Sequence, residues 1–167
     1  MDATDIPLRL VGTFYAFAGI VATRAAISSR FLDRALAAIT MKKPPLSETA
    51  QSLWLITASL IILAGGTALM LKADVAVWVF LVSSILQALY IFLVAPLWFD
   101  REDPPDAKGR QSTPNAFVIY LGATAFVVWA FSTGRLVPWQ QLPRPAIYGS
   151  ASAVLLYIGY VIWSLRR

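Results

Sequence analysis

The sequence predicts an all-α protein, a polytopic membrane bundle of five transmembrane helices with an additional amphipathic helix at the membrane interface. Two observations predict this class. Hydrophobic residues make up 58% of the 167 residues and charged residues only 14%, whereas soluble domains are about 45–50% apolar. The charged residues also cluster between apolar runs that are long enough to cross a bilayer core of about 30 Å. These runs leave no room for a separate soluble domain, so we expect a single membrane domain over residues 1–167.

The first predicted span, 8–27, contains a row of small side chains. They recur at spacings of three and four residues, and they are Gly12, Ala16, Gly19, Thr23 and Ala26. Such spacings place residues on one face of a helix, where small side chains let a neighbouring helix approach closely. We therefore expect this face to be a helix-packing seam.

Residues 28–41 keep a helical period but carry charges. Apolar residues such as Phe31 and Leu36 fall on one side, while Arg30, Asp33 and Arg34 fall on the other. This pattern is typical of an amphipathic helix that lies at the membrane surface or leans on the bundle. The two lysines and two prolines at 42–45 are expected to end this helix.

The second and third spans, 50–71 and 75–99, are separated by only three residues. They are therefore expected to form a tight antiparallel hairpin. The second span contains the consecutive glycines Gly65 and Gly66, which either pack closely against another helix or bend the span.

A polar stretch at 100–114 contains three prolines and predicts a loop. It is followed by a short fourth span at 116–133, an interfacial loop at 134–145 and a fifth span at 146–165. An alternative with four spans stays open, because the first or the fourth segment could fail to cross.

The basic residues predict an orientation. With five spans, ten of the fourteen Lys and Arg residues lie on the side of the C-terminus and four on the side of the N-terminus. Basic residues are enriched on the cytoplasmic side of membrane proteins. We therefore expect a multi-pass protein of the bacterial inner membrane, with the N-terminus outside and the C-terminus in the cytoplasm.

The composition argues against several function classes. The chain contains no His and no Cys, which removes the commonest ligands of zinc, copper, haem iron and iron–sulfur clusters, and the thiol nucleophile. The acidic residues of the 100–114 stretch lie among the basic residues Arg101, Lys108 and Arg110 and have no regular ligand spacing, so we expect a solvated loop rather than a calcium or magnesium site. They are Asp100, Glu102, Asp103 and Asp106. The net charge of +5 is better explained by topology and anionic lipid head groups than by nucleic acid.

Arg24 is the first candidate binding residue, because an arginine inside a span is a functional hypothesis by default. It could hold an anionic lipid head group, a quinone carbonyl or a carboxylate of another subunit. The alternative is that its side chain extends to the nearby membrane surface. Both interpretations stay open at this point.

Gln87, Tyr15 and Tyr90 are further candidates for binding a ligand or a lipid. Gln87 lies near the middle of its span, where its amide binds either a ligand or a neighbouring helix, and Gln51 has the same two roles. The tyrosines belong to an aromatic set that either packs the bundle or lines a pocket for a flat apolar cofactor such as a quinone. The set comprises Phe14, Tyr15, Phe17, Trp54, Trp78, Tyr90, Tyr120, Trp129, Tyr148, Tyr157 and Tyr160.

Parts of two spans resemble a known family. The motif residues are Arg9, Gly12, Tyr15, Ala18 and Gly19, with Gly65, Gly66 and Leu69 in the second span. An arginine that precedes a glycine, an aromatic residue and an Ala-Gly pair resembles the first helix of the DoxX-like membrane proteins. The chain departs from that family in having no acidic residue before the glycine pair and in having an additional span. The resemblance implies a small four-helix subunit associated with quinone-linked oxidoreductase complexes.

The sequence favours a small membrane protein that is a non-catalytic accessory or structural subunit of a larger complex. Its expected partners are the lipid bilayer, anionic lipid, and other membrane subunits or a second copy of the chain. Two alternatives stay open, namely a quinone-interacting component of a DoxX-like oxidoreductase and a carrier of lipid or a small solute.

Overall fold

A computed structural model of the protein describes residues 5–41, 46–99 and 107–166. The elements are α1 (Asp5–Thr40), α2 (Leu46–Met70), α3 (Val75–Leu89), the π-helix η1 (Tyr90–Phe99), α4 (Ala107–Ser132), the 3-10 helix η2 (Trp139–Gln141) and α5 (Arg144–Arg166). Five helical segments are long and apolar enough to cross a membrane, with η1 continuing the third of them. The prediction of an all-α membrane bundle is therefore confirmed.

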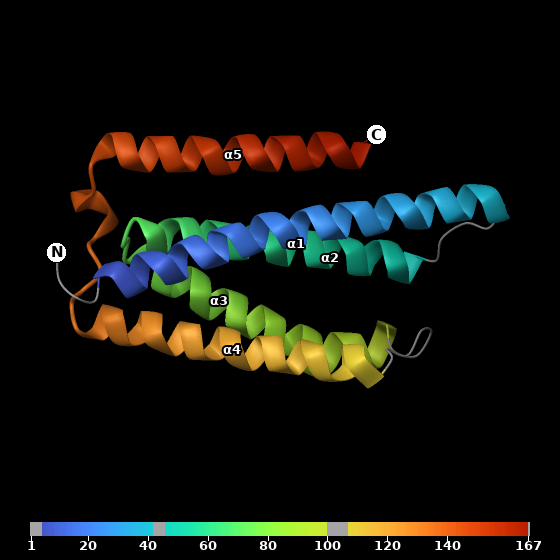
Figure 1. Cartoon of the computed structure of the whole chain (residues 1–167), viewed down its shortest axis with the longest axis horizontal. Coiled ribbons are helices and arrows are strands. Elements are labelled where there is room, and N and C mark those ends of the chain that lie inside the picture. The colour runs from blue at the N-terminus through green and yellow to red at the C-terminus, as the bar shows by residue number, and fades with distance from the viewer. Residues whose placement is uncertain (1–4, 42–45, 100–106, 167) are drawn as a thin grey trace.

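Helices α1 to α4 form the bundle, whereas α5 lies beside it as an outer helix (Figure 1). Val161 is the only fully buried residue of α5. Figure 1 also shows that α1 and α5 run in the same direction along the long axis. Parallel first and last helices are what an odd number of crossings requires.

Helices α1 and α2 pack through their backbones. A Cβ atom added to Gly12 would lie 2.5 Å from the Met70 nitrogen, and one added to Gly19 would lie 2.7 Å from the Leu63 nitrogen. Thr23 continues the same buried face, and its hydroxyl donates a 2.7 Å hydrogen bond to the Gly19 carbonyl. Because no side chain larger than hydrogen fits at the glycines, they set the distance between the two helices.

The consecutive glycines of α2 serve two different neighbours. A Cβ on Gly66 would overlap the Ala16 nitrogen of α1, whereas one on Gly65 would lie 3.0 Å from the Val79 Cγ1 atom of α3. Successive helix residues point about 100° apart. Gly66 can therefore face α1 while Gly65 faces α3. Of the two expected roles, the glycines therefore take close packing.

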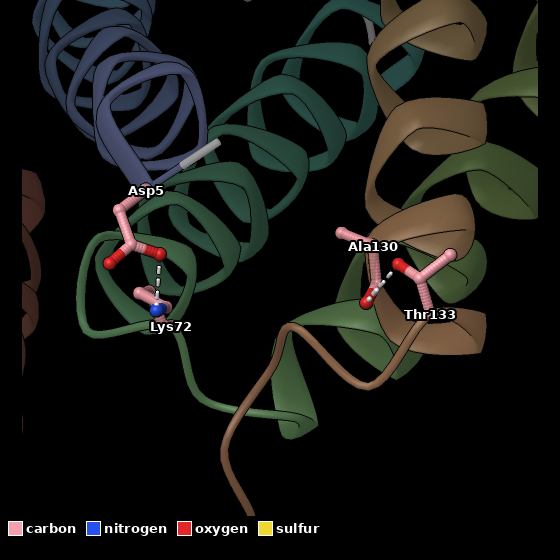
Figure 2. Close-up of polar contacts among 4 residues, drawn as sticks. All are labelled: Asp5, Lys72, Ala130 and Thr133. Atoms are coloured by element: carbon pink, nitrogen blue, oxygen red, sulfur yellow. Dashed lines mark hydrogen bonds and ion pairs between the residues drawn. The ribbon is translucent and has the colours of Figure 1, made fainter. Parts of the chain in front are cut away.

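The turn between α2 and α3 joins several elements. Lys72 adopts a left-handed backbone conformation with φ of 60°, and its Nζ atom forms a 2.5 Å ion pair with Asp5 Oδ1 at the start of α1. Figure 2 shows the two side chains facing each other. Because these groups come from residues 67 positions apart, the pair fixes the start of α1 against the hairpin.

The connection from α4 to α5 is held by the same turn. Thr133 bonds the Ala130 carbonyl at the end of α4 (Figure 2), and Gly134 then takes a φ of 67°, as a helix-ending glycine commonly does. The chain continues to Val137, which bonds the backbone at Lys72 and Asp74 at 2.8 and 2.9 Å. These contacts keep the α4–α5 connection at the hairpin end of the bundle.

The amphipathic segment differs from its prediction in one respect. Residues 28–40 are not a separate helix, because they continue α1 without interruption. No glycine or proline occurs between 20 and 43, so no residue breaks the helix there. The lysines and prolines at 42–45, which were expected to end it, lie outside the described residues.

Helix α4 begins earlier than predicted. Ala107–Ser132 is one helix with Pro114 inside it, so the expected loop at 100–114 is too long. Proline removes one backbone hydrogen bond but is compatible with a helical φ, and water can satisfy the freed carbonyl because the residues before Pro114 are polar. The expected solvated acidic stretch at 100–106 lies outside the described residues.

Candidate functional site

A cavity of about 500 Å³ lies among α1, α2, α3–η1 and α4. Its walls are mostly apolar and aromatic, and it is lined by Tyr15, Ala18, Ala22, Trp54, Leu55, Ala58, Ser59, Ile62, Gln87, Tyr90, Ile91, Thr113, Ala116, Phe117 and Tyr120. Among these described residues none is charged. We call it the aromatic cavity, and its size falls in the range of about 300–1,000 Å³ that is usual for small-molecule sites.

Two lining residues of the aromatic cavity, Tyr15 and Tyr120, belong to a buried cluster of three rings that also includes Phe80. Phe80 stacks on Tyr120 with ring centres 5.4 Å apart and planes at 6°. The Tyr15 ring meets both of them edge-on, at 5.5 Å from Phe80 and 5.2 Å from Tyr120. Edge-to-face and offset-stacked pairs are the preferred arrangements of aromatic rings. Since all three residues are buried, they give α1, α3 and α4 a fixed relative position.

Trp54 and Tyr90 form part of the wall of the aromatic cavity. Their rings are stacked, with centres 5.7 Å apart and planes at 17°, and the Gln51 amide donates a 3.3 Å hydrogen bond to the Tyr90 hydroxyl. Tyr90 is the first residue of η1. We attribute the wider turns of η1 to Pro96, whose ring would clash with a carbonyl four residues earlier in an α-helix. A local irregularity thus begins at a residue of the cavity wall.

Few polar groups face this site. The Gln87 amide donates a 3.1 Å hydrogen bond to the Ser83 hydroxyl one turn earlier. A primary amide has two N–H donors and a carbonyl acceptor, so Gln87 retains a donor and an acceptor beyond this bond. Next to it, the Ser84 and Thr124 hydroxyls join α3 to α4 at 2.9 Å.

The structure brings three of the four predicted binding residues together, because Tyr15, Gln87 and Tyr90 all line the aromatic cavity. Arg24 does not line it. Arg24 is exposed and lies near Tyr157 of α5, whose hydroxyl bonds the Ile20 carbonyl at 3.1 Å. Arg24 is thus separate from the other three candidates.

Sequence reasoning missed Ser59 and Thr113, which also line the cavity. Small hydroxyl residues in spans usually bond their own helix, as Ser59 does with the Leu55 carbonyl at 2.7 Å. Serine and threonine residues within a span therefore do not by themselves indicate a binding site in the sequence. Within the described parts of the chain, no group of three Asp or Glu residues is close enough to hold a metal ion.

Comparison of the chain with protein-family models, with curated proteins and with solved structures finds no match.

Proposed function

We propose that this protein is a membrane-embedded binding subunit whose aromatic cavity takes a flat, uncharged carbonyl compound of the quinone class. The aromatic cavity carries the proposal. Stacked rings at Trp54 and Tyr90 provide a surface for a flat apolar ring, and the Gln87 amide provides a donor for a carbonyl oxygen. The absence of charged residues from the described lining favours a neutral ligand, because a buried charge without a partner is costly.

The role that we propose is binding rather than catalysis. The chain has no His and no Cys, so imidazole and thiol groups cannot carry protons or electrons at this cavity. The resemblance of the first helix to DoxX-like proteins supports a place beside a quinone-linked oxidoreductase.

An accessory role is supported by α5. Large apolar side chains such as Leu155 and Leu156 of α5 are 66% and 75% exposed, and a helix face of this kind contacts lipid or another subunit. We further propose the bacterial inner membrane as the location, with the C-terminus in the cytoplasm, supported by the ten basic residues on that side.

Binding is tested by titrating a short-chain benzoquinone into the purified protein in detergent and following tryptophan fluorescence. Quinone bound against Trp54 should quench its emission, and Trp54→Phe should remove that component. Trp78 is 62% exposed on α3 and does not line the cavity, so Trp78→Phe is the matched control. Equal quenching in both variants would contradict binding in the aromatic cavity.

Extraction gives an independent measurement. Lipid-soluble compounds extracted from protein purified in mild detergent should include a quinone in near-stoichiometric amount, as measured by mass spectrometry. Native mass spectrometry of the same sample should show a partner subunit. A protein that carries quinone but no partner would support binding and reject the accessory role.

A further inference from the structure

A second cavity of about 530 Å³ lies between α1 and α5, on the side where α5 ends. We call it the basic groove. Residues that line it include Arg30, Phe31 and Arg34 of α1, and Trp163, Ser164 and Leu165 of α5. The groove shares no residue with the aromatic cavity, so it needs an explanation of its own.

The groove carries two neighbouring positive charges. Arg30 and Arg34 are four residues apart, so they lie on the same side of α1 and repel each other. Arg34 places its Nη1 and Nη2 atoms 3.5 Å from the Leu165 carbonyl oxygen. In the described part of the chain no carboxylate pairs with either guanidinium. Two neighbouring guanidinium groups that line one groove form a site for an anion, and phosphate is the anion that guanidinium groups match best.

The walls of the groove are apolar. Phe31 is 69% exposed and Trp163 is 50% exposed, and tryptophan is the typical residue of the boundary between lipid chains and head groups. An inorganic phosphate or a soluble phosphate ester gains nothing from such walls. A ligand with both a phosphate and a hydrocarbon part gains from the charges and from the apolar surface.

The next contact between α1 and α5 beyond the groove limits how far an acyl chain could extend between them. The hydrogen bond from the Tyr157 hydroxyl to the Ile20 carbonyl links α5 to α1 ten residues before Arg30. Ten helical residues span about 15 Å, which is about half of the 30 Å hydrocarbon core. The contact between Tyr157 and Ile20 therefore lies about half a hydrocarbon core away from Arg30, which is the thickness of one leaflet.

We propose that the basic groove binds an anionic phospholipid, with its phosphate on Arg30 and Arg34 and its chains between α1 and α5. The lipid fills the basic groove between α1 and α5 and holds this outer helix in place. The binding site is distinct from Arg24, which does not line the groove.

The test uses the full-length protein stripped of lipid and compares phosphatidylglycerol, phosphatidylcholine and soluble glycerol 3-phosphate by native mass spectrometry. We expect phosphatidylglycerol to bind more tightly than the other two. Each juxtamembrane arginine contributes about 1 kcal/mol to anionic lipid binding, so Arg30→Gln or Arg34→Gln should weaken binding about fivefold and the double variant about 25-fold. Arg144→Gln, at the other end of α5, is the control and should bind as the parent does.

The paired variant Arg30→Lys with Arg34→Lys keeps both charges and should keep most of the preference for phosphatidylglycerol. Equal binding of phosphatidylglycerol and phosphatidylcholine would overturn the proposal. Unchanged affinity in the double glutamine variant would also overturn it, and binding of glycerol 3-phosphate as tightly as the lipid would identify a soluble phosphate instead. None of these three results bears on quinone binding, because the two cavities share no residue.

Discussion

The Lys72 Nζ atom lies 2.5 Å from the Asp5 Oδ1 atom, and the two side chains are only 18% and 15% exposed. The pair connects the first residue of α1 to the turn that follows α2. That turn also holds the α4–α5 connection through Val137 and Trp139. The turn at residues 72–74 thus connects α2 to α3 and also contacts the start of α1 and the α4–α5 connection.

Removing this ion pair should destabilise the bundle. We expect Lys72→Met or Asp5→Asn to lower the free energy of unfolding by about 1–2 kcal/mol, because a hydrogen-bonded, mostly buried ion pair is worth more than an exposed one. Unfolding by SDS in mixed micelles measures the change, and Asp33→Asn is the control. A double variant that loses as much as the sum of the single ones would show that the pair has no coupling energy.

The glycine contacts between α1 and α2 predict a sharp difference among glycine substitutions. Gly66→Ala should cost about 3 kcal/mol, because its methyl group would overlap the backbone of α1 and the helices would have to separate. Gly65→Ala should cost less, since the Val79 side chain can shift. Gly122→Ala is the control, because nothing lies within 4 Å of that position. Thermal unfolding in detergent should rank the variants in this order, and equal losses at Gly66 and Gly122 would argue against backbone packing.

The Ser84–Thr124 hydrogen bond predicts a modest coupling between α3 and α4. A double-mutant cycle with Ser84→Ala and Thr124→Val should give a coupling energy of about 0.6 kcal/mol, the average for such bonds in membrane proteins. A second cycle that pairs Ser84→Ala with Thr13→Val is the control and should give no coupling energy, because the Thr13 hydroxyl bonds the Arg9 carbonyl of its own helix. A coupling energy near zero would mean that the two hydroxyls act independently.

Filling the aromatic cavity should block ligand binding without unfolding the protein. Ala58 lines the cavity, and Ala58→Phe places a ring where a quinone ring would stack. We expect at least a tenfold loss of benzoquinone affinity, measured by fluorescence quenching, with unchanged helix content by circular dichroism. Ala153→Phe on the exposed side of α5 serves as the comparison. Retained affinity in the Ala58 variant would place the ligand elsewhere.

The five crossings predict the location of the chain ends. Reporter proteins fused to the two termini should report opposite sides of the membrane, with the C-terminal reporter in the cytoplasm. A fusion within the α2–α3 turn should report the same side as the N-terminus. Both ends on one side would require four or six crossings and would reject the topology.

Much of this arrangement follows from the sequence. The five apolar runs predict the five membrane helices because a bilayer needs about 20 apolar residues for each crossing. The three-residue gap at 72–74 requires a hairpin, and the spacing of Gly12 and Gly19 marks the face that meets α2. Run length, gap length and glycine spacing are local properties, so they can be determined from the sequence without knowing the tertiary structure.

The boundaries that deviated have local causes as well. The sequence predicts a loop up to Pro114, yet one proline near a polar helix end costs little and the helix continues through it. The amphipathic pattern of residues 28–41 predicts an additional helix, but charge alone does not interrupt a helix, and residues 28–40 continue α1. At both positions the residues are compatible with helical backbone angles, so the helix continues.

The sequence by itself determined the helices, their order and the chemistry available to them, which includes neither imidazole nor thiol groups. Only the tertiary structure decided which side chains meet. Trp54, Gln87 and Tyr90 come together with Tyr15 in the aromatic cavity, whereas Arg24 lies apart and Arg30 and Arg34 share a groove with α5. The physical reason is that neighbours across a bundle depend on how each helix is rotated and how closely the glycines let α1 and α2 approach, which no local pattern specifies.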